Sequence, residues 1–159
     1  MKNTINKIQI IKNPIHLLAF GLGLGFMPFM PGTFGTLLGV LIYFLNNYYF
    51  ITPEVVLLIL TTILGIYICG KTAKDINHHD HPGIVFDEVV GYLVTMLFIS
   101  FSVFNIILGF ILFRIFDIVK PWPISYCDKK LNGGFGIMFD DILAGIFANI
   151  VLRMILLYV

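Results

Sequence analysis

Long apolar stretches follow one another along most of this chain, and short segments between them hold nearly all of its charges. Four stretches of helix length occupy residues 34–50, 55–70, 89–104 and 105–119, and a fifth runs from 142 to 159. About 20 apolar residues in a helix cross the hydrocarbon core of a bilayer. Because 58% of the residues are hydrophobic and only 12% are charged, the sequence predicts an all-α fold, a polytopic membrane helix bundle with about five transmembrane helices.

The Lys and Arg residues indicate how these helices are oriented, because basic residues in short loops stay cytoplasmic. If residues 34–50 form the first span, every Lys and Arg except Arg153 lies on one side, and the opposite connections, 51–53 and 100–105, have none. Counting residues 17–30 as another span would place the first lysines outside. We therefore expect an interfacial or re-entrant segment at 17–30 and a tight turn at 100–105.

The same reasoning predicts one membrane-embedded domain over residues 1–159, with residues 1–13 as a retained cytoplasmic extension. No small-residue cleavage site follows the N-terminal lysines. The net charge of +1 provides no basic field of the kind that tracks nucleic acid. Membrane lipids are therefore the expected partners, and nucleic acid is not.

Almost all of the acidic residues fall on the predicted cytoplasmic side, and only Glu54 falls on the other. They are Asp75, Asp80, Asp87, Glu88, Asp117, Asp128, Asp140 and Asp141. Carboxylates that converge at one depth repel one another unless a cation neutralises them. Oxygen ligands suit Mg²⁺, which takes one or two carboxylates together with water and phosphate oxygens.

The segment Pro31-Gly-Thr-Phe-Gly-Thr36 opens the first predicted span. Backbone N–H groups near Gly35 and the hydroxyls of Thr33 and Thr36 are candidate phosphate ligands at a helix N-terminus. The alternative is an ordinary N-cap, with Pro31 breaking the chain.

Two acidic pairs each stand at the start of a predicted helix. Asp87 and Glu88 precede the third span, and Asp140 and Asp141 follow a glycine-rich turn before the last one. Each pair alone could simply interact favourably with a helix dipole. A divalent-cation site is the functional alternative, and the convergence of several acidic pairs favours it.

Arg114, Asp117 and Lys120 recur every three residues and so share one face at the end of the fourth predicted helix. The two cations could merely extend toward lipid headgroups. Asp117 does not fit that explanation, and it indicates a metal ligand flanked by two cations that bind phosphate. Separately, His78, His79 and His81 form a His-rich segment with Asp80, which is either a solvated loop or a soft-metal site.

Four motifs occur in order: PGTFGT, IVFDEVVGY, FRIFDIVKPWPI and GGFGIMFDD, the last followed by an apolar helix. Together they resemble the phosphatidylglycerophosphatase A family over nearly the whole chain. The resemblance implies a multi-pass enzyme of the bacterial cytoplasmic (inner) membrane with its active site on the cytoplasmic face. It also implies Mg²⁺-dependent hydrolysis of phosphatidylglycerophosphate to phosphatidylglycerol and phosphate.

The resemblance carries the family's functional residues onto positions of this chain. Catalytic roles fall on Asp87, Arg114, Asp117 and Lys120, metal binding on Asp87, Glu88, Asp117, Asp140 and Asp141, and phosphate binding on Thr33, Gly35, Thr36, Arg114 and Lys120. Either water or an aspartate, Asp87 or Asp117, serves as the nucleophile.

Two other classes of membrane protein are alternatives. A CDP-alcohol phosphotransferase would show a spaced D-G…A-R…G…D…D arrangement on consecutive helix turns, and that arrangement is not found. A small transporter or channel subunit with a cytoplasmic-face cation site would place charges near the bilayer midplane. The acids here gather at one surface instead, which favours chemistry on a lipid headgroup.

Overall fold

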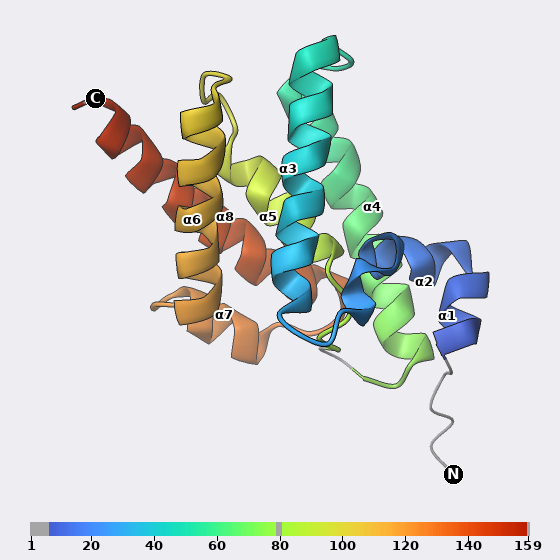
Figure 1. The fold of residues 1–159 in the computed structure, drawn as a ribbon. Coiled ribbons are helices and arrows are strands. Elements are labelled where there is room, and N and C mark those ends of the chain that lie inside the picture. The colour runs from blue at the N-terminus through green and yellow to red at the C-terminus, as the bar shows by residue number, and fades with distance from the viewer. Residues whose placement is uncertain (1–6, 79–80, 159) are drawn as a thin grey trace.

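A computed structural model describes residues 7–78 and 81–158 of the chain, so His79 and Asp80 of the His-rich segment lie outside the described residues. Within those ranges the fold is all-helical, as the sequence predicted. The helices are α1 Lys7–Lys12, α2 Pro14–Ala19, the 3-10 helix η1 Gly21–Phe26, α3 Pro31–Tyr49, α4 Glu54–Asp75, α5 Phe86–Thr95, α6 Val103–Val119, α7 Ile124–Lys130 and α8 Gly133–Leu156 (Figure 1).

Helix α5 lies at the centre of the bundle, between α3, α4, α6 and α8 (Figure 1). Tyr92 and Val89 of this helix are fully buried, as are Phe113 of α6 and Leu152 of α8, and these side chains share one apolar cluster. A helix that is apolar on nearly every side is stable only when other helices cover it. The position of α5 matters for function because its first turn bears Asp87 and Glu88.

Two helices in the described ranges are long and apolar enough to cross a membrane, namely α4 and α8. The expectation of five crossings is not confirmed. The expected span at residues 89–104 differs most from the structure, because α5 ends at Thr95. At about 1.5 Å per residue, a helix of 10 residues is only about 15 Å long, half the thickness of the hydrocarbon core.

The segment at residues 17–30 does not form one long helix. The chain instead forms α2 and η1, which pack against α4 and α3 respectively. His16 joins α2 to α4, with its Nδ1 2.9 Å from the Thr72 hydroxyl and its Nε2 3.4 Å from Asp75. The lengths of α2 and η1, six residues each, agree with the expected absence of a full span there.

Residues 96–102 connect α5 to α6, so the turn expected at residues 100–105 overlaps this connection and its last three residues already belong to α6. The Ser102 side chain caps α6 by accepting a hydrogen bond of 3.1 Å from the Asn105 backbone N–H, while the Asn105 amide donates to the Ser100 carbonyl at 2.8 Å. Such capping is typical of serine before a helix. This turn and the connection between α3 and α4 lie at the end of the bundle away from α7 (Figure 1).

Candidate active site

A cavity of about 330 Å³ opens where the first turn of α3, the first turn of α5, the end of α6, helix α7 and the first half of α8 meet. Its charged lining consists of Asp87, Glu88, Arg114, Asp117, Lys120, Asp128, Asp140 and Asp141. These residues come from four helices and the residue that follows α6. The structure thus brings together every charged residue that the sequence assigned to the site.

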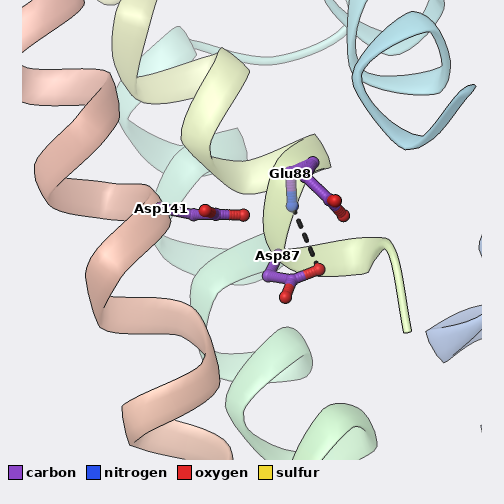
Figure 2. A group of neighbouring side chains, drawn as sticks. All are labelled: Asp87, Glu88 and Asp141. Atoms are coloured by element: carbon purple, nitrogen blue, oxygen red, sulfur yellow. Dashed lines mark hydrogen bonds between the residues drawn. The ribbon is translucent and has the colours of Figure 1, made fainter. Parts of the chain in front are cut away.

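Three of the carboxylates form a compact group that suits a cation. Asp87 and Glu88 come from α5 and Asp141 comes from α8, and Figure 2 shows the Asp141 side chain pointing toward the turn of α5 that bears Asp87 and Glu88. One oxygen from each lies within 4.8 Å of the other two. Two ionised groups at that separation repel by about 3 kcal/mol even at an effective dielectric constant of about 20. A bound divalent cation would remove this repulsion, so the group fits a hard metal ion such as Mg²⁺.

Glu88 has a further feature that points to a ligand. Its Oε2 is buried and has no hydrogen-bond partner among the described residues. A buried carboxylate oxygen without a partner costs free energy, and native proteins rarely retain one without a function. Gly32 of α3 makes room for Glu88, because a Cβ atom at residue 32 would collide with Glu88 Oε1.

Arg114 and Asp117 form an ion pair on one face of α6. The side chains are 14% and 11% exposed, so water screens the pair only partly. The Arg114 guanidinium also lies 3.4 Å from the hydroxyl of Thr36 on α3, and its Nε is buried without a partner among the described residues. Arg114 therefore keeps an N–H donor that has no partner within the described ranges, near the cluster formed by Asp87, Glu88 and Asp141.

Lys120 pairs with two carboxylates at once. Its Nζ lies 2.9 Å from Asp128 of α7 and 2.6 Å from Asp140 of α8. Burial alone would lower the pKa of the ammonium, but the negative charge of Asp140 and the hydrogen bonds to Asp128 and Asp140 raise it above its ordinary value. Lys120 therefore remains a cation at neutral pH.

The segment Pro31–Thr36 is the first part of helix α3 rather than a loop before it. Pro31 occupies a position where its missing N–H is tolerated. The cavity lining from this region comes from Met30, Pro31 and Gly32. Thr36 is fully buried and donates a hydrogen bond to the Gly32 carbonyl at 2.9 Å, while Gly35 packs against Val85. Of the expected phosphate ligands here, Thr33 has a buried hydroxyl without a partner among the described residues.

Asp128 is the charged lining residue to which the sequence assigned no role. It lies eight positions beyond Lys120, past two prolines, and that spacing does not correspond to a shared helix face. Only the turn between α6 and α7 brings the two side chains together. Its place among the acids on the predicted cytoplasmic side was the one signal in the sequence that could have marked it.

A sequence model of the phosphatidylglycerophosphatase A family matches residues 17–156. The chain belongs to the phosphatidylglycerophosphatase A family. A phosphatidylglycerophosphatase A from Haemophilus influenzae is 46% identical over 151 residues, which cover 94% of this chain and 92% of that protein. One from Escherichia coli is 40% identical, over 87% of this chain and 81% of that protein. No solved structure gives a significant match.

Another relative carries a different name. A protein of Bacteroides thetaiotaomicron, provisionally named a phosphatidylinositol-3-phosphatase, is 36% identical over 86% of this chain and 89% of its own length. All three relatives are named as phosphatases of lipid phosphates. Membership of the phosphatidylglycerophosphatase A family confirms the resemblance drawn from the four motifs and favours an enzyme over a transporter or channel subunit. Together with the two long apolar helices, it indicates a membrane protein.

Proposed function

We propose that this chain hydrolyses the phosphomonoester of phosphatidylglycerophosphate, in a Mg²⁺-dependent reaction that yields phosphatidylglycerol and inorganic phosphate. The observation that carries the proposal is the convergence of Asp87, Glu88 and Asp141 beside the cations Arg114 and Lys120 in one cavity. A phosphomonoester needs both elements, a metal site and positive groups for its oxygens. Family membership supports the choice of substrate.

In this proposal Asp87, Glu88 and Asp141 hold the Mg²⁺. When bound, the ion supplies Lewis-acid polarisation of the phosphate and lowers the pKa of bound water. Asp117 and Asp140, also expected as metal ligands, line the same cavity but pair with Arg114 and Lys120. Each contact uses one carboxylate oxygen, so the other oxygen of Asp117 and of Asp140 could still bind a metal ion.

Arg114 and Lys120 bind the non-bridging oxygens of the phosphate and stabilise the charge that develops there. Asp117 orients the Arg114 guanidinium, since the two side chains form an ion pair on one face of α6. Thr33, expected as a phosphate ligand, has a buried hydroxyl and does not line the cavity, so the proposal gives it no contact with phosphate. The buried Thr36 supports Arg114, whose guanidinium lies 3.4 Å from its hydroxyl. The cavity volume of about 330 Å³ is at the small end for ligand sites, so the acyl chains stay outside it.

The nucleophile is water in one version of the proposal and Asp87 or Asp117 in the other. An aspartate nucleophile would form an acyl phosphate, which water would then hydrolyse. Acid quenching of the enzyme with a ³²P-labelled substrate distinguishes these versions. Label that remains on the protein would indicate an aspartate nucleophile, and the labelled peptide would identify the attacking residue.

Activity is tested with purified protein in detergent. Inorganic phosphate should be released from phosphatidylglycerophosphate in the presence of Mg²⁺ and not in the presence of a chelator. Phosphatidylinositol 3-phosphate is the comparison substrate, because one relative is provisionally named for it. Folded protein that releases no phosphate from phosphatidylglycerophosphate would contradict the proposal. Faster release from phosphatidylinositol 3-phosphate would indicate that the inositol lipid is the preferred substrate.

We place the site on the cytoplasmic face of the bacterial inner membrane in a multi-pass protein. The distribution of Lys and Arg supports this orientation. Single cysteines at Thr52→Cys and Lys130→Cys, in a background without Cys69 and Cys127, should react with an impermeant reagent from opposite sides. Labelling from the same side would contradict the topology.

A further inference from the structure

The ammonium group of Lys120 is held by two carboxylates from different helices. Asp128 of α7 accepts a hydrogen bond of 2.9 Å and Asp140 of α8 accepts one of 2.6 Å. A lysine ammonium has three N–H donors. Two of them are used in these contacts, and Lys120 lines the cavity, so the direction of its third donor depends on both anchors.

The backbone around Lys120 is arranged so that both contacts form. Lys120 ends α6 in the left-handed conformation, with φ 43° and ψ 59°, and its N–H bonds to the Phe116 carbonyl. A residue with a side chain adopts this conformation at a cost in free energy. The turn redirects the chain into α7, which brings Asp128 back over Lys120.

We infer that Asp128 is a positioning residue: together with Asp140 it fixes the Lys120 ammonium so that the third N–H donor faces the substrate phosphate. A single anchor would leave the ammonium free to rotate about one hydrogen bond, whereas two anchors define its orientation. This inference rests on the proposed role of Lys120 in binding phosphate. It gives Asp128 a role through Lys120 and not through contact with substrate.

An ion pair elsewhere in the molecule provides a matched comparison. Lys71 and Asp75 of α4 are 3.1 Å apart and 40% and 36% exposed, against 28% and 32% for Lys120 and Asp128. The two pairs are similar in distance and exposure. They differ in that Lys120 lines the cavity and has Asp140 as a second carboxylate partner, whereas Asp75 also lies 3.4 Å from His16 Nε2. An effect that any broken surface ion pair causes should appear in both variants.

Substitutions at residue 128 separate positioning from charge. Asp128→Ala removes the anchor and the charge, whereas Asp128→Asn removes only the charge and keeps a carbonyl oxygen that accepts from Lys120. We expect Asp128→Ala to raise both the KM for phosphatidylglycerophosphate and the inhibition constant of inorganic phosphate by about tenfold. Asp128→Asn should stay within about threefold of wild type, and the Mg²⁺ concentration for half-maximal activity should not change in either variant.

If Asp128 acted through its charge alone, Ala and Asn would behave alike, and both would bind phosphate more tightly because a repelling carboxylate is gone. Equal effects of the two variants, or wild-type constants in Asp128→Ala, would overturn the inference. A lower kcat with an unchanged KM would indicate a structural role and would overturn it as well. Asp75→Ala, the control, should leave the KM and the inhibition constant unchanged.

Two further measurements keep the test decisive. If Asp128→Ala does not fold, Asp128→Glu retains the charge but displaces the anchor. Positioning then predicts a KM above that of wild type for Glu and close to wild type for Asn, whereas a charge effect predicts a wild-type KM for Glu and a lower one for Asn. Phosphate binding is also read from the rise in Tm that inorganic phosphate causes in the presence of Mg²⁺. If wild type binds phosphate but hydrolyses no lipid, the proposed function fails, and the Tm shifts of the variants still decide the role of Asp128.

Discussion

Charged side chains have different kinds of partner at the two ends of the bundle. At the end away from the cavity, Glu54 accepts a hydrogen bond of 2.9 Å from the Phe98 backbone N–H, and Arg153 donates one of 2.8 Å to the Leu97 carbonyl. Asn149 supports the same turn by donating to the Thr95 carbonyl at 2.7 Å. The charges at this end bind backbone groups and hold the turn between α5 and α6 in place.

At the cavity end, the charged groups face one another. Arg114 pairs with Asp117, Lys120 pairs with Asp128 and Asp140, and Glu88 keeps a buried oxygen without a partner among the described residues. Groups that bind backbone stabilise the fold, whereas converging carboxylates destabilise it unless a ligand is present. The comparison therefore separates charges that hold structure from charges kept for a ligand.

Substitution in the cluster of Asp87, Glu88 and Asp141 should have the largest effect on turnover. Asp141→Asn is expected to reduce turnover by at least about a hundredfold, because it removes a proposed metal ligand. In chelator its Tm should not fall, and should rise if Asp141 is ionised, because one repelling charge is gone. Phosphate release and thermal unfolding, each with and without Mg²⁺, measure both effects. A lower Tm in chelator would place Asp141 among the structural charges.

Asp117→Asn should reduce turnover by about ten- to a hundredfold, because Arg114 loses the charge that orients it. Its Tm should fall, in contrast to that of Asp141→Asn, because a guanidinium only 14% exposed loses its ionic partner. The same two assays apply. Activity close to that of wild type would remove Asp117 from the site.

Gly32→Ala tests how closely α3 must approach the carboxylate group. The new Cβ would displace Glu88, and we expect activity to fall about tenfold. Gly109→Ala in α6 is the control, because its Cβ would meet Met96 and Leu152, away from the cavity. That variant should lose stability and keep the activity per folded molecule. Equal loss of activity in both variants would mean that helix packing alone is responsible.

Arg153→Gln, at the opposite end, should have the smallest effect on function. Loss of the hydrogen bond to the Leu97 carbonyl should lower the free energy of unfolding by about 1 kcal/mol. Turnover per folded molecule should stay the same. Thermal unfolding and phosphate release in detergent provide the two values, and reduced turnover at an unchanged Tm would contradict the distinction between the two ends.

Several features of the site were predictable because they depend on local spacing. Arg114 and Asp117, three residues apart, share one face of α6 as expected, whereas Lys120 follows the end of the helix in the left-handed conformation. Asp87 and Glu88 stand at the start of a helix in the structure, as expected. The contact between Asp128 and Lys120 was not predictable, because a non-helical turn separates them.

The separate contacts of Asp140 and Asp141 were also not predictable from the sequence. Successive residues on a helix are about 100° apart around its axis, so neighbouring carboxylates face different surroundings. Asp141 joins Asp87 and Glu88, whereas Asp140 binds Lys120. Residues 89–104 were similarly misjudged as one span, because an apolar run does not show where a helix stops when other helices enclose it.

The sequence by itself determined an all-helical, strongly apolar chain with its charges at helix ends, because these properties depend on composition and on spacing within single segments. It also determined the family, through four motifs in order. Only the tertiary structure decided which carboxylates gather as a group, which ones neutralise Arg114 and Lys120, and that α5 is a short enclosed helix. These outcomes depend on which helices pack together, and contacts between distant segments leave no regular spacing in the chain.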